Sequence, residues 1–259
     1  MINKNHYAHP LDISIIEKIF KTHVSASLAE TVIDNSLDAV YDYTLENSYA
    51  CLPRDDLAWS YIEEGHELFG GSPIRAVYVM REYEYDVVCK GYNHPAILVP
   101  HTLLQQENRE IIRARMLSAV AAAAMEHHKL EFMLWLLETM GGSIPLPVIP
   151  DVFRGLLYEW YRCRRYTTDR AVYLATGKLS LALQNILYGQ IPFEMLNSFT
   201  FGGENDTFLA QVRELEAAGG LSGAASKLIG IFQKESWLTS RYRELITFSR
   251  EQEGGVIHA

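Results

Sequence analysis

The sequence predicts an α+β protein that is mostly helical. Apolar side chains recur with the three-to-four-residue spacing of a helix over long stretches before residue 70 and after residue 105. Between residues 74 and 100, three short segments rich in β-branched and aromatic residues have the composition of strands. No repeat, low-complexity linker or compositional border divides the 259 residues, so we expect a single domain over 1–259.

The N-terminal part, about 1–105, begins with helices. The segment PLDISIIEKIFKTHV (10–24) places isoleucines at helical spacing, and Asp12 is a suitable N-cap residue. Further helices are expected over about 26–48 and about 55–69, the second of which ends at Gly70-Gly71.

The strand segments follow, and a long helix comes after them. The strands are expected in IRAVYVMREY (74–83), YDVVCKG (85–91) and PAILVP (95–100), with GYNH as the turn between the last two. Helical spacing then continues without a break over about 106–140.

The C-terminal part, 141–259, is expected to be helical. GGSIPLPVIP (141–150) breaks the long helix, and further helices are expected over about 151–176 and about 179–188. The remainder has the pattern of short helices, separated by TFGGEN (200–205) and AAGGLSG (217–223).

Composition limits the partners and the compartment. A net charge of −9 argues against nucleic-acid binding, and the densest basic stretch, YRCRRY (161–166), is interpreted as a solvated helix face. No apolar run reaches the ~18–20 residues of a membrane span, and the N-terminus lacks a signal-peptide core. The three cysteines form no CxxC pair, which is typical of reduced thiols. We therefore expect a soluble, cytoplasmic protein with no membrane partner.

Two clusters resemble metal sites at first sight. His66-Glu67 begins like an HExxH motif, but Gly70 stands where the second histidine is needed. His127 and Glu131 are spaced to share a helix face, with His128 beside them. A metal site completed from elsewhere is one interpretation; a solvated or hydrogen-bonding role is favoured, because adjacent histidines on a helix point about 100° apart.

Five segments in the same order resemble the soluble, stand-alone branch of the HtpX-like and CAAX-prenyl-protease-like zinc metallopeptidases. The segments are HPLD (9–12), GYNHPAILVPHTLLQQENREIIRARML (91–117), YRCRRYTTDRAVYLATGKLSLALQNIL (161–187), FLAQVRELEA (208–217) and LTSRYRELITFSR (238–250). The resemblance implies a zincin-like fold with a small, mainly antiparallel sheet. It also implies that the long helix over about 106–140 is a former active-site helix.

The zinc-binding residues of that family are replaced here. Its HELGH motif falls on SAVAA (118–122), so that Ser118 and Ala122 stand for the two histidines and Ala119 for the general base. A further histidine of the family falls on His127, and the third ligand, a glutamate, falls on Arg165. Alanine and a guanidinium cannot ligate zinc, so we expect no metal and no cofactor.

A replacement for the metal is suggested by the same positions. Arg165 and Asp169 are spaced to pair on one helix, and Asp169 matches a carboxylate that supports the site in the family. We expect the Arg165 guanidinium near the former zinc position, with Asp169 and another buried carboxylate as partners, because a buried guanidinium needs a partner. The alternative is that small residues only allow close helix packing and that Arg165 lies on the surface.

The expected function is that of a catalytically inactive metallopeptidase homologue. In active members a peptide adds to the edge strand before the active-site helix, here around 85–91, where the family's asparagine-alanine falls on Asp86-Val87. A peptide or protein partner is therefore expected, in an adaptor or regulatory role. The alternative is an enzyme of changed, metal-independent chemistry acting on a peptide or small molecule in the same cleft. Its candidate residues are Arg165, Asp169, Ser118, His127 and Tyr166.

Overall fold

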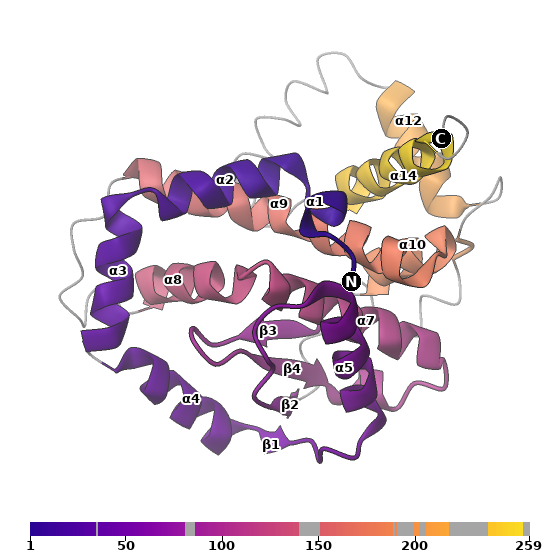
Figure 1. The fold of residues 1–259 in the computed structure, drawn as a ribbon. Coiled ribbons are helices and arrows are strands. Elements are labelled where there is room, and N and C mark those ends of the chain that lie inside the picture. Colours follow the sequence, from indigo (N-terminus) through magenta and orange to yellow (C-terminus); the bar gives the residue numbers. More distant parts are fainter. Residues whose placement is uncertain are drawn as a thin grey trace.

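The computed structural model describes residues 1–34, 36–80, 86–139, 151–188, 190, 199–201, 206–217 and 238–255. Most of these residues are helical and one small sheet accompanies them, which confirms the α+β class (Figure 1). Among the described residues, no helix is both long enough and apolar enough to cross a membrane. The expected breaks at GGSIPLPVIP and AAGGLSG lie outside the described residues, apart from Ala217.

The N-terminal part contains helices and a four-stranded sheet. Its elements are α1 (Lys4–Tyr7), α2 (Pro10–Phe20), α3 (His23–Asp34), α4 (Leu37–Ser48), β1 (Ala50–Cys51), α5 (Leu57–Phe69), β2 (Val77–Met80), β3 (Val88–Lys90), β4 (Ala96–Pro100) and α6 (His101–Leu104). The helices that follow are α7 (Arg109–Ala124), α8 (His127–Thr139), α9 (Asp151–Thr176), α10 (Leu179–Tyr188), α12 (Thr207–Ala217) and α14 (Leu238–Gly255).

The sheet is mixed, with strand order β1-β2-β4-β3. The central pair β2–β4 is parallel, whereas β1–β2 and β4–β3 are antiparallel, so the expected mainly antiparallel sheet is right only for the outer pairs. GYNH connects β3 to β4 as expected. Gly91 has a φ of 106°, and a Cβ there would lie 2.7 Å from the His94 carbonyl oxygen, so this turn needs glycine. Because β3 is the last strand in this order, it forms one edge of the described sheet.

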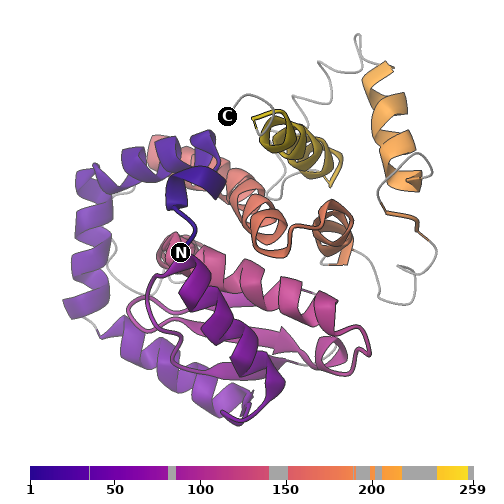
Figure 2. The same cartoon turned by 45° about the vertical axis from the view of Figure 1, so that its right-hand side comes forward.

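Helices cover both faces of the sheet. Leu45 of α4 packs with Tyr78 and Leu98 on one face, while Val77, Ile97 and Val99 join the core formed by α5 and α7 on the other. A second core joins α2, α3, α8 and α9, and Figures 1 and 2 show α2 lying along α9. Helix α7 thus lies between the sheet and α9, and this position brings the site residues together.

Two long helices expected from the sequence are each interrupted by a residue in the left-handed region. Ser36 has a φ of 51° and separates α3 from α4 within the expected helix over 26–48. Glu126 has a φ of 59° and separates α7 from α8 within the expected helix over 106–140. A left-handed residue ends a helix because it turns the backbone that follows away from the helical path; the Glu126 N–H itself donates to the Ala123 carbonyl at 3.0 Å.

The expected N-cap of the first long helix was wrong. Helix α2 begins at Pro10, and its N-cap is His9, whose Nδ1 accepts from the Leu11 N–H at 3.3 Å. Asp12 is instead fully buried and faces α8 and α9. Proline is favoured at the first helical position, so Pro10 accounts for the earlier start.

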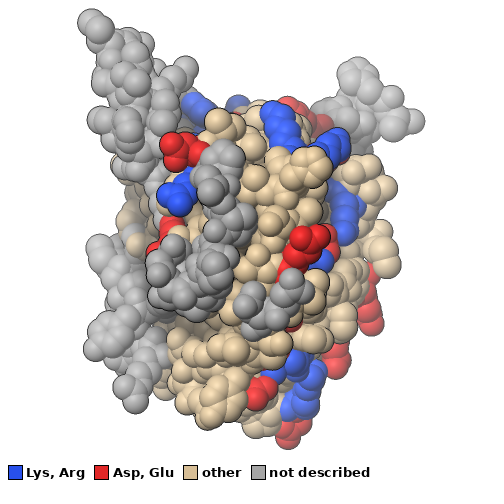
Figure 3. All heavy atoms as spheres, turned by 90° about the vertical axis from the view of Figure 1, so that its left-hand side faces the viewer, with Lys and Arg blue, Asp and Glu red and all other residues tan. Residues whose placement is uncertain are grey.

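Charge on the surface is mixed. In Figure 3, Lys and Arg side chains occur in small groups near Asp and Glu, and the described part of that face carries no broad basic area.

Close packing of α5 on α7 yields a prediction about Gly65. A Cβ at Gly65 would lie 2.8 Å from Val120 Cβ. Gly65→Ala should therefore lower the free energy of unfolding by about 1–3 kcal/mol, despite the higher helix propensity of alanine. Gly155→Ala on α9, where nothing lies within 4 Å of the new Cβ, should raise it by about 0.5–1 kcal/mol. Urea denaturation of both variants measures this; stabilisation by Gly65→Ala would contradict it.

Candidate functional site

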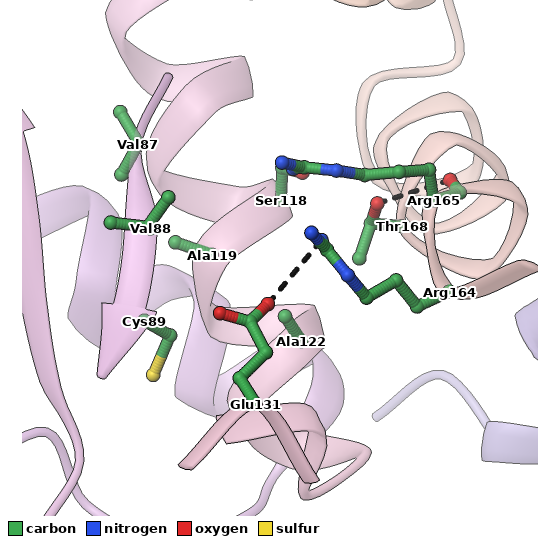
Figure 4. Close-up of a pocket in the computed structure, with 10 residues that line it drawn as sticks. All are labelled: Val87, Val88, Cys89, Ser118, Ala119, Ala122, Glu131, Arg164, Arg165 and Thr168. Carbon is green, nitrogen blue, oxygen red and sulfur yellow. Dashed lines mark hydrogen bonds and ion pairs between the residues drawn. The ribbon is translucent and has the colours of Figure 1, made fainter. Parts of the chain in front are cut away.

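A small pocket lies where the edge strand β3 meets helices α7, α8 and α9 (Figure 4). Its volume is about 290 Å³, which includes space open to solvent. The lining residues are Val87, Val88 and Cys89 from the β3 segment, Ser118, Ala119 and Ala122 from α7, Glu131 from α8, and Arg164, Arg165 and Thr168 from α9. The pocket therefore combines an apolar strand, a floor of small residues and two guanidinium groups.

Helix α7 supplies the floor through its spacing. Ser118, Ala119 and Ala122 lie within a little more than one helical turn and share a face. Their short side chains leave room for long side chains from α9, and Figure 4 shows Arg164 and Arg165 reaching toward α7. Ser118, Ala119, Ala122 and Arg165, which were singled out from the sequence, thus lie together around one pocket.

The partner of Arg165 differs in part from the expectation. Its side chain is 11% exposed and forms an ion pair with Asp86, rather than with Asp169. Asp86 also accepts a hydrogen bond from the buried Arg115 of α7. A single, partly buried carboxylate just before β3 therefore bridges two helices and is the partner of Arg165.

Asp169 is paired elsewhere. Arg241 of α14 donates to both of its oxygens, at 2.9 Å and 2.7 Å, in a two-pronged ion pair that is almost fully buried. The i to i+4 spacing permits an Arg165–Asp169 pair, but Arg241 engages both oxygens of Asp169 instead. The sequence carries no signal for Arg241, because it lies 72 residues away.

Glu131 of α8 lines the pocket as the charged partner of two cations. Its carboxylate lies 3.3 Å from the Arg164 guanidinium and 3.2 Å from Lys90 Nζ. Burial by itself raises the pKa of Glu131, but the positive charges of Arg164 and Lys90 outweigh it and lower the pKa to about 2. Arg164 also stacks on the Tyr161 ring, 3.8 Å from its centroid.

The interpretation of YRCRRY as a solvated face is wrong for Arg164, which is 4% exposed. Its neighbour Arg165 lines the same pocket. Consecutive residues on a helix point about 100° apart, and both can reach the pocket only because arginine is long and flexible. A run of basic residues in the sequence does not show that two adjacent arginine side chains extend into the same pocket.

His127 and His128 are buried away from the pocket lining. His127 Nε2 lies 2.9 Å from Asp12, whose other neighbour is the Thr167 hydroxyl at 2.5 Å. Burial raises the pKa of Asp12, but the His127 charge and the hydrogen bonds from His127 and Thr167 outweigh it, so the pKa is lowered overall. Burial also lowers the pKa of His128 to about 4, so this imidazole is neutral at pH 7.

Within the described ranges, no three His, Cys, Asp or Glu side chains come close enough to hold a metal ion. His127 pairs with Asp12, and Glu131 pairs with Lys90 and Arg164. The alternative of a metal site built from His127, His128 and Glu131 therefore finds no ligand set in the described part of the chain.

Of the candidate residues for changed chemistry, Ser118 and Arg165 line the pocket together, whereas Asp169, His127 and Tyr166 are not part of its lining. Ser118 and Cys89 line the pocket, but no histidine does, and burial raises the pKa of the Cys89 thiol far above neutrality. Tyr166 lies outside the pocket lining beside His9, with ring centroids 5.0 Å apart, and burial raises its pKa to about 12. Among the described lining residues, no histidine lies beside Ser118 as a base.

Comparisons with known proteins returned no match: no family model, no curated protein and no solved structure matches the chain.

The environment of Glu131 yields a pH-dependent prediction. Because its folded pKa of about 2 lies below 4.5, ionised Glu131 stabilises the fold above pH 4.5, and this contribution is lost as the pH falls toward 2. Glu131→Gln should lower the free energy of unfolding by about 3 kcal/mol at pH 7 and by roughly half as much at pH 3. Urea denaturation across this range measures the difference.

The control for Glu131→Gln is Glu138→Gln, an exposed position on the same helix, which should change stability by less than about 0.5 kcal/mol. A loss for Glu131→Gln that stays constant from pH 7 to pH 3 would show that the charge of Glu131 is not what stabilises the site.

Proposed function

We propose that this protein binds an extended peptide along β3 without cleaving it, as a catalytically inactive homologue of the HtpX-like and CAAX-prenyl-protease-like metallopeptidases with a zincin-like fold. The observation that carries the proposal is that the edge strand β3 lines the same pocket as Ser118, Ala119, Ala122 and Arg165. These are the positions that correspond, by the resemblance, to the metal ligands and general base of an active enzyme.

Strand addition follows from the chemistry of a sheet edge. Among the described strands β3 pairs only with β4, and in this proposal the peptide pairs with the backbone groups on the other side of β3. A peptide backbone can pair with those N–H and C=O groups, while alternate side chains of the peptide point toward opposite faces. One such side chain, or the end of the peptide, then lies over the pocket.

Peptide cleavage by the family's route is incompatible with the residues at these positions. Zinc binding requires imidazole, thiolate or carboxylate groups, whereas the corresponding residues here are Ser118, Ala122 and Arg165. Ala119 cannot take a proton from water, and a guanidinium repels a dication. Arg165 pairs with Asp86, and the nearby carboxylate of Glu131 pairs with Arg164 and Lys90, so the donor set does not fit zinc.

Peptide binding is tested with a library of short synthetic peptides with random sequences and free carboxyl ends. Selected peptides should slow the hydrogen exchange of β3 backbone amides by about tenfold or more, because strand pairing protects exposed N–H groups. Strand β1, the opposite edge of the sheet, is the internal control and should be unaffected. The proposal is rejected when no peptide is retained, or when binding protects amides elsewhere and leaves those of β3 unchanged.

The absence of peptidase chemistry has its own test. Purified protein incubated with zinc and then dialysed should contain well under one zinc per chain, because the positions for the ligands hold Ser118, Ala122 and Arg165. Atomic absorption measures the metal, and a chelator should not change peptide affinity. Tight, stoichiometric zinc that disappears in His127→Ala would instead support a rebuilt metal site.

A further inference from the structure

Arg165 and Asp169 lie one helical turn apart on α9, yet each pairs with a residue from another part of the chain. Arg165 pairs with Asp86 just before β3, and Asp169 pairs with Arg241 of α14. All four side chains are at most 18% exposed. Because the two α9 side chains could also pair with each other, the structure contains one of two possible pairings.

The observed pairing is favoured by geometry. Arg241 donates to both oxygens of Asp169, at 2.9 Å and 2.7 Å, and a buried two-pronged ion pair holds a carboxylate firmly. Pairs spaced i to i+4 on one helix stabilise it only slightly, and the order with the cation first is the weaker one. Asp169 is therefore held by Arg241, and Arg165 remains with Asp86.

Loss of Arg241 would leave Asp169 as a buried carboxylate without its cation, which is a costly state. Two described arginines are near enough to respond. Arg165 is one turn away on α9. Arg115 of α7 is also close, because the charge of Asp169 opposes the burial that lowers the pKa of Arg115 to about 9.

Arg115 is the more firmly held of these two arginines. It donates to the Asn185 carbonyl at 3.1 Å and to the Asn185 side-chain oxygen at 3.4 Å, and it also donates to Asp86. The Arg165 side chain has Asp86 as its ion-pair partner among the described residues. Arg165 can therefore turn from Asp86 to Asp169 at a smaller cost, and Asp86 would keep Arg115 as its partner.

We infer that Arg241 is a positioning residue of the candidate site: by holding Asp169, it keeps Arg165 on Asp86 and in the pocket lining. Arg241 is not among the described residues that line the pocket, and it acts from α14, which packs on α9 (Figures 1 and 2). The inference rests on the proposed function, because the pocket is where that proposal places the peptide. The exchange of partners itself is measured without a peptide.

Double-mutant cycles test the exchange. Urea denaturation gives the unfolding equilibrium constants of Arg165→Gln, Asp86→Asn and their combination, and the departure from independent effects measures the Arg165–Asp86 coupling. This coupling should be about fivefold or more in the wild type and less than about twofold in Arg241→Gln. The Arg165–Asp169 coupling, measured with Asp169→Asn, should become stronger by about threefold or more in Arg241→Gln.

Two further variants separate positioning from a structural role. Arg241→Gln combined with Asp169→Asn still lacks the ion pair, but the competing carboxylate is gone, so the Arg165–Asp86 coupling should return to about fivefold or more. Arg241→Lys keeps the charge but loses the two-pronged fork, so its coupling should lie between those of the wild type and Arg241→Gln. This variant carries the test if Arg241→Gln does not fold.

The matched control is Arg170→Gln. Arg170 also joins α9 to α14, since it lies 3.9 Å from Glu244 and over the Phe248 ring at 4.5 Å from its centroid. Its replacement removes the same charge and loosens the same helix contact but leaves Asp169 with Arg241. The Arg165–Asp86 coupling should therefore change by less than about twofold.

Peptide affinity is the second readout, measured by fluorescence anisotropy with the peptides retained in the binding experiment. Arg241→Gln should weaken binding by about threefold or more, because Arg165 leaves the pocket lining, and the additional Asp169→Asn should restore it. Unchanged affinity in a variant that has lost the Arg165–Asp86 coupling overturns the positioning role.

An Arg165–Asp86 coupling that is unchanged in Arg241→Gln and Arg241→Lys also overturns the inference. So does a loss of coupling that Asp169→Asn does not restore or that Arg170→Gln reproduces, because such a loss reports a general loosening of α14. A protein that binds no peptide rejects the proposed function, and the urea cycles distinguish this result from the others.

Discussion

The small side chains of α7 are the constraint on which the rest of the structure depends. Ala119, Ala121, Ala123 and Ala124 are buried, and Gly65 of α5 meets Val120 so closely that even a methyl group does not fit. Large side chains here would push α5 and α9 away from α7 and would leave the arginines of α9 without a place to enter. The alanines thus allow the helices to pack closely. On the face toward α9 they also leave space that the guanidinium groups of α9 occupy.

Buried polar side chains link helices by hydrogen bonds, which alanine side chains cannot form. Asp12 of α2 contacts His127 of α8 and Thr167 of α9, and the His9 N–H donates to the Thr167 hydroxyl at 3.0 Å. The left-handed residue Glu126 separates α7 from α8, and His127 is the first residue of α8. Such contacts depend on direction, so they fix how helices from distant parts of the chain are oriented.

Sequence patterns predicted the class of the fold, the strand segments, α5, and the bounds of α9 and α10, because apolar spacing and turn residues report local structure directly. They missed the break at Met125-Glu126, where alanine, glutamate and histidine all allow a helix and no glycine or proline marks an end. They also assigned Asp12 to an N-cap and paired Asp169 with Arg165. The first error arises because Pro10 starts the helix before Asp12. The second arises because local spacing shows which pairs can form, whereas Arg241 competes for Asp169 from a distant position.

The bridge through Asp86 has a mechanical consequence for the helix pair. A face made of alanines is smooth, and two helices packed through it could slide along each other at little cost in buried apolar area. Asp86 holds Arg115 of α7 and Arg165 of α9 at the same time. A slip of one helical turn, about 5.4 Å, would separate a guanidinium from the shared carboxylate. The two ion pairs of Asp86 therefore fix the register of α7 against α9. In cores with larger side chains, the interlocking shapes of those side chains fix the register instead.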